Sequence, residues 1–208
     1  MYRDTENWYK FEYERVGKYG FPTMESVHIE PQKAIPFNYA KGCKEPENSC
    51  VHFFLDDYQF DRVWRQPERY AEMLLRFHCV TTPDFSMYTD MPEILQMYNH
   101  YRKQWLGAYW QELGMQVIPT VSWSTEDSFK WCFDGIPKNS CVAVSSVGCM
   151  NNKNSKNGFI KGYEEMIRRL KPEMILFFGK KPEEISGNIV EMGSFQEQIR
   201  ERSKKNGR

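Results

Sequence analysis

The stretch CVHFFLDDY (residues 50–58) combines an apolar run with two adjacent carboxylates, Asp56 and Asp57. A short run of consecutive apolar residues is typical of a strand that is buried on both faces, and the polar residues that follow mark its end. Residues 79–86, 117–123 and 141–148 have the same form. The chain is therefore expected to contain several buried strands that end in polar or aromatic side chains.

Segments with helical character lie between these strands. Apolar side chains recur at helical spacing in residues 68–77 and 158–170, and the longest such segment runs from Asp90 to residue 112. Shorter helices are expected at 3–16 and 124–133, and further strands at 34–38, 174–179 and 188–192. Strands that alternate with helices predict βα units and a parallel sheet covered on both faces.

Six or seven strands fit two α/β architectures, a small or incomplete TIM-like (β/α) barrel and an open doubly wound sheet. We favour the barrel, because polar residues follow nearly every strand. The sequence also has no G-x-G-x-x-G and no G-x-x-x-x-G-K-[ST] motif, one of which a nucleotide-binding open sheet would be expected to carry.

The length of 208 residues fits one domain. We expect a single α/β domain over residues 1–195, with residues 1–31 as an N-terminal extension packing on it. Residues 196–208 are polar and basic and are expected to be a frayed tail. The formal net charge is zero, but residues 1–149 are net −5 and residues 150–208 are net +5. Such a basic end is either a solvated face or a contact for phosphate.

The six cysteines are expected to be reduced thiols. The chain opens with charged and aromatic residues rather than a signal peptide, and no apolar run approaches the roughly 20 residues of a membrane span. These features predict a cytoplasmic protein with no membrane contact. Cys43 and Cys50 are separated by six residues, which is wider than the usual spacing of zinc ligands. We therefore expect no metal site built from cysteines.

The loops after the strands are the expected functional site, because parallel α/β folds build their sites at the carboxyl ends of the strands. Asp57 and Asp84 end successive strands and are the predicted catalytic pair, one as general acid and the other as base or nucleophile. Neighbouring strand residues point to opposite faces, so only one of Asp56 and Asp57 should face the site, and we favour Asp57. The predicted substrate-binding residues are Asp56, Ser86, Asn99, Arg102, Trp123, Ser145 and Ser146.

Several of these residues have alternative interpretations. Asp57 is also placed to cap a helix or to pair with Arg62 or Arg65. Asn99 and Arg102 share one face of the long helix and either tie down a loop or bind an anionic substrate group. No cofactor is predicted, but Mg²⁺ held by Asp56, Asp57 and Asp84 is the alternative to metal-free acid–base chemistry.

Nucleophilic catalysis by serine or cysteine has little support in the sequence. There is no G-x-S-x-G motif, and none of the four histidines follows a strand. Cys149 follows a strand end, but no histidine is placed to activate it.

Several motifs resemble, in the same order, an uncharacterised domain family of phages and bacterial mobile elements, domain of unknown function 4417 (DUF4417). The segments that carry the resemblance are IPFN (35–38), FFLDDYQFDRVW (53–64), PDFSMYTDMP (83–92), NHYR (99–102), VIP (117–119), CFDGIP (132–137) and VSSVGC (144–149). The resemblance covers roughly residues 34–180. It implies a phage or mobile-element setting in a bacterial host and carries no established activity.

The leading hypothesis is an enzyme that acts on a nucleobase, nucleotide or nucleic acid, by N-glycosidic cleavage or base exchange. Trp123 would stack the base and Arg102 would hold phosphate. The alternative is a non-catalytic binding or inhibitory protein that sequesters a nucleotide or a host protein. Nucleic-acid binding through the basic C-terminal region is a further hypothesis.

Overall fold

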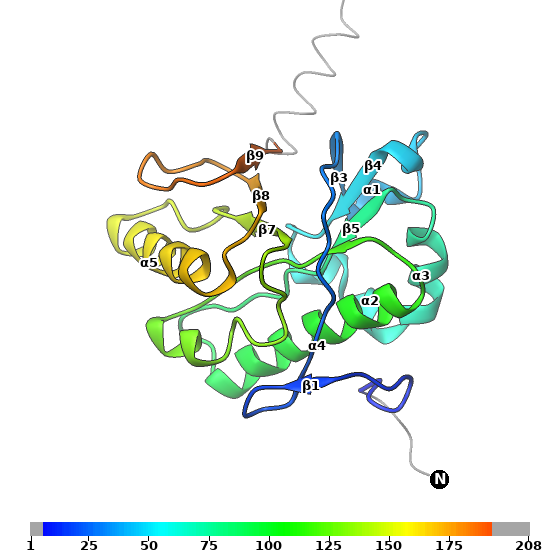
Figure 1. Cartoon of the computed structure of the whole chain (residues 1–208), viewed down its shortest axis with the longest axis horizontal. Helices are drawn as coiled ribbons and strands as arrows, with labels where there is room; N and C mark the ends of the chain where they lie inside the picture. Colours follow the sequence, from blue (N-terminus) through cyan, green and yellow to red (C-terminus); the bar gives the residue numbers. More distant parts are fainter. Residues whose placement is uncertain (1–5, 193–208) are drawn as a thin grey trace, which may run out of the picture.

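The computed structural model describes residues 6–192 of the chain, and its elements alternate between strands and helices (Figure 1). The strands are β1 (Arg15–Val16), β2 (Phe21–Pro22), β3 (Lys33–Pro36), β4 (Ser49–His52), β5 (Cys79–Thr81), β6 (Val117–Ile118), β7 (Cys141–Ser145), β8 (Met174–Phe178) and β9 (Ile189–Glu191). The α-helices are α1 (Phe37–Ala40), α2 (Asp61–Arg65), α3 (Pro67–Leu74), α4 (Glu93–Glu112) and α5 (Lys153–Leu170). The short 3₁₀ helices are η1 (Pro46–Asn48), η2 (Asp57–Gln59) and η3 (Glu126–Lys130).

Two parallel sheets follow the order of the chain, β3-β4-β5-β6 and β7-β8-β9. A single parallel bridge between Thr120 and Ala143 joins them. Beside it, the Val121 N–H donates to the Ala143 carbonyl at 2.8 Å and the Ala143 N–H donates to the Pro119 carbonyl at 2.9 Å. The α/β fold of βα units predicted from the sequence is confirmed.

The barrel is not closed in the part of the chain that the structure describes, because β3 and β9 lie at the outer edges of the two sheets and do not pair. Strand order never reverses along either parallel sheet, whereas a doubly wound sheet reverses its order at a switch point. The strand arrangement is therefore that of an incomplete barrel.

Side chains from successive strands meet in one interior cluster. Its buried members are Val27, Ala34, Cys50, Cys79, Ile118, Cys141, Ala143, Leu176 and Phe178. The register places Ala34 beside Cys50 and Cys50 beside Cys79, so small side chains fill a layer across three strands. Two larger clusters lie between the strands and the helices. One combines strand side chains with apolar side chains of α2, α3 and α4, and the other combines strand side chains with those of α5.

Strand β4 (Ser49–His52) is buried on both faces, which accounts for the largely apolar run at residues 50–55. Val51 and Phe53 belong to the outer core, whereas Cys50 and Phe54 belong to the interior cluster. His52 is buried near Phe178, with ring centroids 4.7 Å apart. Burial lowers the pKa of His52 to about 3, so this imidazole is neutral at physiological pH.

Residues 6–31 pack against the rest of the described chain, and the helix predicted at residues 3–16 is wrong over its described part. Residues 15–22 instead form the antiparallel pair β1 and β2, with Gly17 and Gly20 at φ of 71° and 69° in the turn between them. Left-handed backbone of this kind favours glycine and ends any helix. Phe11 packs against Trp105 at a centroid distance of 5.2 Å. Residues 1–5 and the predicted basic tail, 196–208, lie outside the described residues.

The two long helices begin at positions that differ from those predicted. Helix α4 begins at Glu93, directly after Pro92. Helix α5 begins at Lys153 rather than near residue 158, because the Asn152 side chain accepts a hydrogen bond from the Ser155 N–H at 2.9 Å and caps the first turn.

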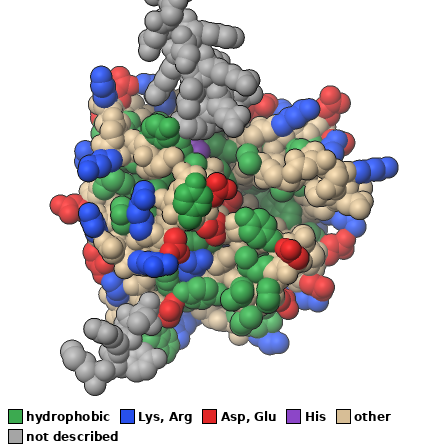
Figure 2. Space-filling model, turned by 180° about the vertical axis from the view of Figure 1, so that it is seen from behind, with side chains coloured by type: hydrophobic (Ala, Val, Ile, Leu, Met, Phe, Trp, Pro, Cys, Tyr) green, Lys and Arg blue, Asp and Glu red, His purple; other side chains and the backbone are tan. Residues whose placement is uncertain are grey.

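Hydrophobic and acidic side chains adjoin on the face shown in Figure 2, with lysines and arginines scattered among them. Within residues 6–192, no helix combines the length and the apolar character needed to cross a bilayer. All six cysteines are free thiols.

Candidate functional site

A cavity of about 480 Å³ lies at the carboxyl ends of β4, β5, β6 and β7. Its lining is Phe54, Leu55, Asp56, Gln59, Asp84, Phe85, Ser86, Met87, Tyr88, Val121, Ser122, Trp123, Ser145, Val147, Gly148, Cys149 and Phe159. Five of the nine residues predicted for the site therefore line one cavity: Asp56, Asp84, Ser86, Trp123 and Ser145. The other four, Asp57, Asn99, Arg102 and Ser146, do not contribute to its wall.

Asp84 is the carboxylate in this cavity with the most perturbed ionisation. It follows β5 after Pro83, and burial raises its pKa to about 6. The charge of Asp57 raises this pKa further, while the charge of Lys103 and a hydrogen bond from Ser122 lower it. An acid with a pKa near neutrality can both give and take a proton under physiological conditions.

Asp57 holds the loop that follows β5 and does not face the cavity. Its carboxylate accepts hydrogen bonds from the Ser86 N–H, at 3.2 and 3.1 Å to its two oxygens, and from Ser86 Oγ at 2.8 Å. Asp56, the residue before it, lines the cavity instead. Because η2 begins at Asp57, the backbone turns there and directs its carboxylate toward the Ser86 loop.

Asn99 and Arg102 lie behind the same loop. Asn99 Nδ2 donates to the Ser86 carbonyl at 2.6 Å, and Arg102 donates to Asn99 Oδ1 at 2.5 Å and to Asp61 at 3.1 Å. The Arg102 guanidinium also lies 3.8 Å from the centroid of the Phe85 ring. These contacts match the structural tie that the sequence left open as an alternative to anion binding.

Trp123 forms one wall of the cavity and is held against helix α5. Its ring lies 5.3 Å from that of Phe159, at an interplanar angle of 39°. Gly162 permits this approach, because a Cβ atom at residue 162 would lie 2.1 Å from Trp123 Nε1. The indole is therefore positioned by a close contact with the helix.

The two serines at the end of β7 differ in position. Ser145 lines the cavity and its Oγ accepts from the Val147 N–H at 3.2 Å. Ser146 is buried and its Oγ donates to the Lys180 carbonyl at 2.8 Å, which ties the end of β7 to the segment after β8.

Lys103 is a polar residue of the site that the sequence interpretation missed. It lies on α4, is 1% exposed, and donates from Nζ to Ser122 Oγ at 2.7 Å. Its position four residues after Asn99 places both on one helix face. That spacing is the signal that identifies it, but a lysine among aromatic residues is ordinarily interpreted as solvent-exposed.

Other reactive groups near the cavity have unfavourable ionisation for nucleophilic attack. Burial and the charge of Asp84 raise the pKa of the Cys149 thiol, which disfavours the reactive thiolate. Within residues 6–192, no three His, Cys, Asp or Glu side chains converge closely enough to hold a metal ion. Asp56, Asp57 and Asp84 thus do not converge as a group of three in the described structure.

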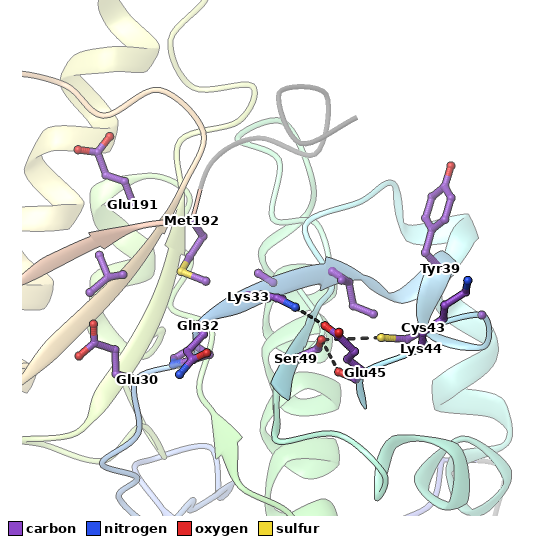
Figure 3. Close-up of a pocket in the computed structure, with 15 residues that line it drawn as sticks. Glu30, Gln32, Lys33, Tyr39, Cys43, Lys44, Glu45, Ser49, Glu191 and Met192 are labelled. Atoms are coloured by element: carbon purple, nitrogen blue, oxygen red, sulfur yellow. Dashed lines mark hydrogen bonds and ion pairs between the residues drawn. The ribbon is translucent and has the colours of Figure 1, made fainter. Parts of the chain in front are cut away.

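A second and larger cavity, of about 930 Å³, lies between β3 and β9 where the barrel is open (Figure 3). Among its charged side chains, Lys33 pairs with Glu45, and the Glu45 carbonyl accepts from Ser49 Oγ at 2.8 Å. No described group in its wall has an ionisation as strongly perturbed as that of Asp84 in the first cavity. The cavity at the strand ends, which contains Asp84, is the better candidate site.

Many basic side chains of the C-terminal region are neutralised locally. Lys156 pairs with Glu184 at 2.6 Å, Lys161 pairs with Glu126 at 2.5 Å, and Arg168 and Arg169 both pair with Glu165. Within residues 150–192, these ion pairs weaken the case for a phosphate-binding surface on α5.

A model of the family described as "Domain of unknown function (DUF4417)" matches residues 13–196. The chain belongs to the DUF4417 family. The resemblance seen in the sequence motifs is thus confirmed over most of the chain.

Similar curated proteins come from phages, in agreement with the expected setting. The Gene 1 protein of Mycobacterium phage L5 is 38% identical to this DUF4417 protein over 170 residues, which are 81% of this chain and 74% of the relative. The Gene 1 protein of Mycobacterium phage D29 is 44% identical over 170 residues, which are 77% of this chain and 63% of the relative. The chain thus spans about three quarters of one relative and less than two thirds of the other. No solved structure matches it significantly.

Proposed function

We propose that this DUF4417 protein is an enzyme of the bacterial cytoplasm that acts on a nucleoside or nucleobase, by cleaving an N-glycosidic bond or exchanging the base. The observation that carries the proposal is the carboxyl group of Asp84. Burial raises its pKa to about 6, and it shares a cavity with the indole of Trp123. A weak acid beside an aromatic wall suits protonation of a stacked base as it leaves.

Asp84 is the general acid in this scheme. It donates a proton to a ring nitrogen of the departing base, which makes the base a neutral leaving group. Asp56 lines the same cavity and is the second carboxylate, stabilising positive charge at the sugar or accepting a proton from water. Asp57 takes a different role from the one expected from the sequence, because its oxygens already accept the Ser86 N–H and hydroxyl. It positions the loop that carries Asp84.

The lining of the cavity supports an uncharged ligand rather than a nucleotide. No lysine, arginine or histidine lies among its described wall residues, and Asp56 and Asp84 contribute negative charge. A phosphate group would find no cation there and would be repelled by the carboxylates. The volume of about 480 Å³ falls in the usual range for small-molecule sites. These properties favour a nucleoside or free base over nucleic acid.

The test incubates the full chain with a panel of ribonucleosides and deoxyribonucleosides and measures the released free base by chromatography. The full chain should release base from at least one of them. Asp84→Asn should lower kcat/KM by about 100-fold or more, since it removes general acid catalysis. Trp123→Leu should mainly raise KM. Asp127→Asn, which alters a carboxylate that is 77% exposed, is the control and should leave turnover unchanged. Equal turnover by Asp84→Asn and the native chain would refute the role of Asp84.

The second candidate function is non-catalytic sequestration of the same kind of ligand. It is favoured by the engagement of Asp57 with Ser86, which leaves one fewer free carboxylate for chemistry than the sequence predicted. Equilibrium dialysis with the panel that is used for turnover separates the two functions. A nucleoside that binds and is recovered intact supports sequestration, and a nucleoside that binds and is cleaved supports the enzyme.

A further inference from the structure

The parallel strands β3 to β9 form one array with an open edge at each end. They follow the order of the chain, and the bridge between Thr120 and Ala143 joins the two sheets. The array therefore contains seven parallel strands, whereas a closed (β/α) barrel has eight. One strand position is unoccupied within residues 6–192, and it lies between β3 and β9.

The cavity of about 930 Å³ lies at this position and is bounded by both edge strands. Its wall includes Lys33, Ala34 and Ile35 of β3 and Val190 and Glu191 of β9, and Figure 3 shows Lys33 and Glu191 on opposite sides of the gap. Strand β3 has four residues. At the usual rise of a strand these span about 13 Å, so the cavity offers two backbone edges to a short extended segment.

The backbone of β9 has hydrogen-bonding groups that face this gap. The Met192 N–H donates to the Phe177 carbonyl at 2.9 Å, and the Asn188 carbonyl accepts from the Ile175 N–H at 2.9 Å. Both bonds are directed toward β8. Successive backbone N–H groups along a strand point to opposite sides, so the Glu191 N–H points away from β8 and into the gap. An edge of this kind is a template for pairing with another strand.

The side chains beside the gap are apolar on both faces of the array. Ala34 and Val190 pack with the interior cluster, whereas Ile35 and Ile189 pack with the two outer clusters. Ile35, Ile189 and Val190 are only half-buried. A strand between β3 and β9 would complete their burial on both faces. Strands buried in this way are nearly continuous apolar runs, so the segment that fits is a short apolar run.

We infer that the gap between β3 and β9 is a docking site for an extended apolar segment of a partner protein, which completes the barrel as its eighth strand. In recognition by strand addition, main-chain hydrogen bonds provide affinity and the side-chain positions provide specificity. The site is separate from the cavity that contains Asp84. The inference therefore does not depend on the proposed chemistry at that carboxyl group.

The composition of residues 193–208 indicates that a separate chain supplies this strand. These residues follow β9 directly, and their sequence is GSFQEQIRERSKKNGR. It contains five lysines and arginines, and its two large apolar residues, Phe195 and Ile199, are not consecutive. The segment thus lacks the apolar run that both faces of the gap require.

The test selects binding peptides from a displayed library of random linear heptapeptides, with the full chain immobilised as the target. The selected peptides should share a run of about four apolar residues. Synthetic copies should bind Glu191→Pro about tenfold or more weakly than the native chain, because proline removes the N–H that faces the gap and leaves a peptide carbonyl without its partner. Glu191→Ala loses the same side chain but keeps the N–H, so it should weaken binding far less.

Amide exchange measured by NMR in the native full chain is a second readout that needs no variant. The Glu191 amide should exchange about tenfold or more slowly when a selected peptide is bound, whereas the Met192 amide, already bonded to β8, should change less. Slow exchange of the Glu191 amide before peptide is added would show that this chain or a second copy fills the gap, and would overturn the inference. A library that yields no binding peptide, or peptides that bind the native chain and Glu191→Pro equally well, would overturn it too.

Discussion

At the scale of single residues, the ionisation of Asp84 links the site to the stability of the fold. An aspartate in an unfolded chain titrates near pH 4, whereas burial raises the pKa of Asp84 to about 6 in the folded protein. Below about pH 4 the carboxyl is protonated in both states and does not affect stability. As the pH rises toward 6, the unfolded chain releases this proton more readily. The carboxyl of Asp84 therefore destabilises the fold progressively between about pH 4 and pH 6, and by a constant amount above about pH 6.

This linkage predicts a pH-dependent effect of Asp84→Asn. Two pKa units correspond to about 2 to 3 kcal/mol, so the free energy of unfolding of the variant should rise by about that amount relative to the native chain between pH 4 and pH 7.5. Urea denaturation at the two pH values measures the change. Asp127→Asn should show no such gain, because the hydrogen bond and charge of Lys130 lower the pKa of that exposed carboxyl. A difference that stays constant with pH would contradict the raised pKa of Asp84.

The individual roles of Asp84 and Asp57 show how far sequence can define a site. Both positions at the strand ends were predicted, and both lie close to the cavity. The sequence did not reveal that Asp84 lines the cavity while Asp57 holds a loop. The partner of Asp57 is Ser86, which lies 29 residues away along the chain. Lys103 was missed for a related reason: its partners Ser122 and Asp84 are brought to it only by the packing of α4 against the strands.

At the scale of elements, helix α5 contains two glycines with opposite surroundings. A Cβ at residue 158 would meet no atom within 4 Å, whereas a Cβ at residue 162 would meet the Trp123 ring. Gly158→Ala should therefore stabilise the protein by about 0.5 to 1 kcal/mol through helix propensity. Gly162→Ala should stabilise it less or destabilise it, because the indole must move.

A double-mutant cycle separates these two effects. In a Trp123→Ala background the clash is absent, so Gly162→Ala should become stabilising by about as much as Gly158→Ala. Thermal denaturation of the four single and double variants provides the measurement. If Gly162→Ala has the same effect with and without the tryptophan, the contact between Trp123 and α5 does not limit residue 162.

Helix α4 fixes the Asp84 loop through Asn99. Removing its amide in Asn99→Ala leaves the Ser86 carbonyl and Arg102 without this partner and should cost about 1 to 3 kcal/mol. Glu112→Ala, at the exposed end of the same helix, should change stability far less. Chemical denaturation compares the two variants. Equal stability would show that the loop is held by the bonds of Asp57 alone.

The elements themselves were largely predictable from apolar runs and helical spacing, with errors where local hydrogen bonding decides. Strand β5 ends at Thr81 rather than continuing toward Phe85. Pro83 has no N–H to continue a ladder, and the Thr82 carbonyl accepts from Thr120 Oγ1 at 2.6 Å. Strand β3 likewise ends at Pro36 rather than continuing to residue 38, because α1 begins at Phe37. Helix α5 begins at Lys153 rather than near residue 158 because Asn152 caps it, and the spacing of apolar residues does not reveal such a cap.

At the scale of the whole molecule, the open barrel predicts uneven protection of the backbone. Strand β9 pairs on one side only and its residues are half-buried or exposed, whereas β8 pairs on both sides and is largely buried. Native-state hydrogen exchange should show the amides of Ile189–Glu191 opening at lower free energy than those of Met174–Phe178. Equal protection of the two strands would indicate that another segment covers the β9 edge.

The sequence predicted the βα order and favoured a barrel, but it did not predict where the ring would stay open. Alternation of strands and helices is a local property that periodicity reveals. Closure depends on whether β3 and β9 approach each other, which is set by the curvature of all the strands between them.

The two parallel sheets are joined by the single bridge between Thr120 and Ala143, whereas strands within each sheet pair over several residues. The join between the sheets is therefore the part of the strand array with the least backbone pairing. The candidate cavity straddles this join, with Asp84 and Trp123 on one side and Ser145 and Cys149 on the other. A bound ligand would contact side chains from both sheets and so strengthen the join between them. The force needed to pull them apart in a single-molecule stretching experiment should therefore rise when the cavity is occupied.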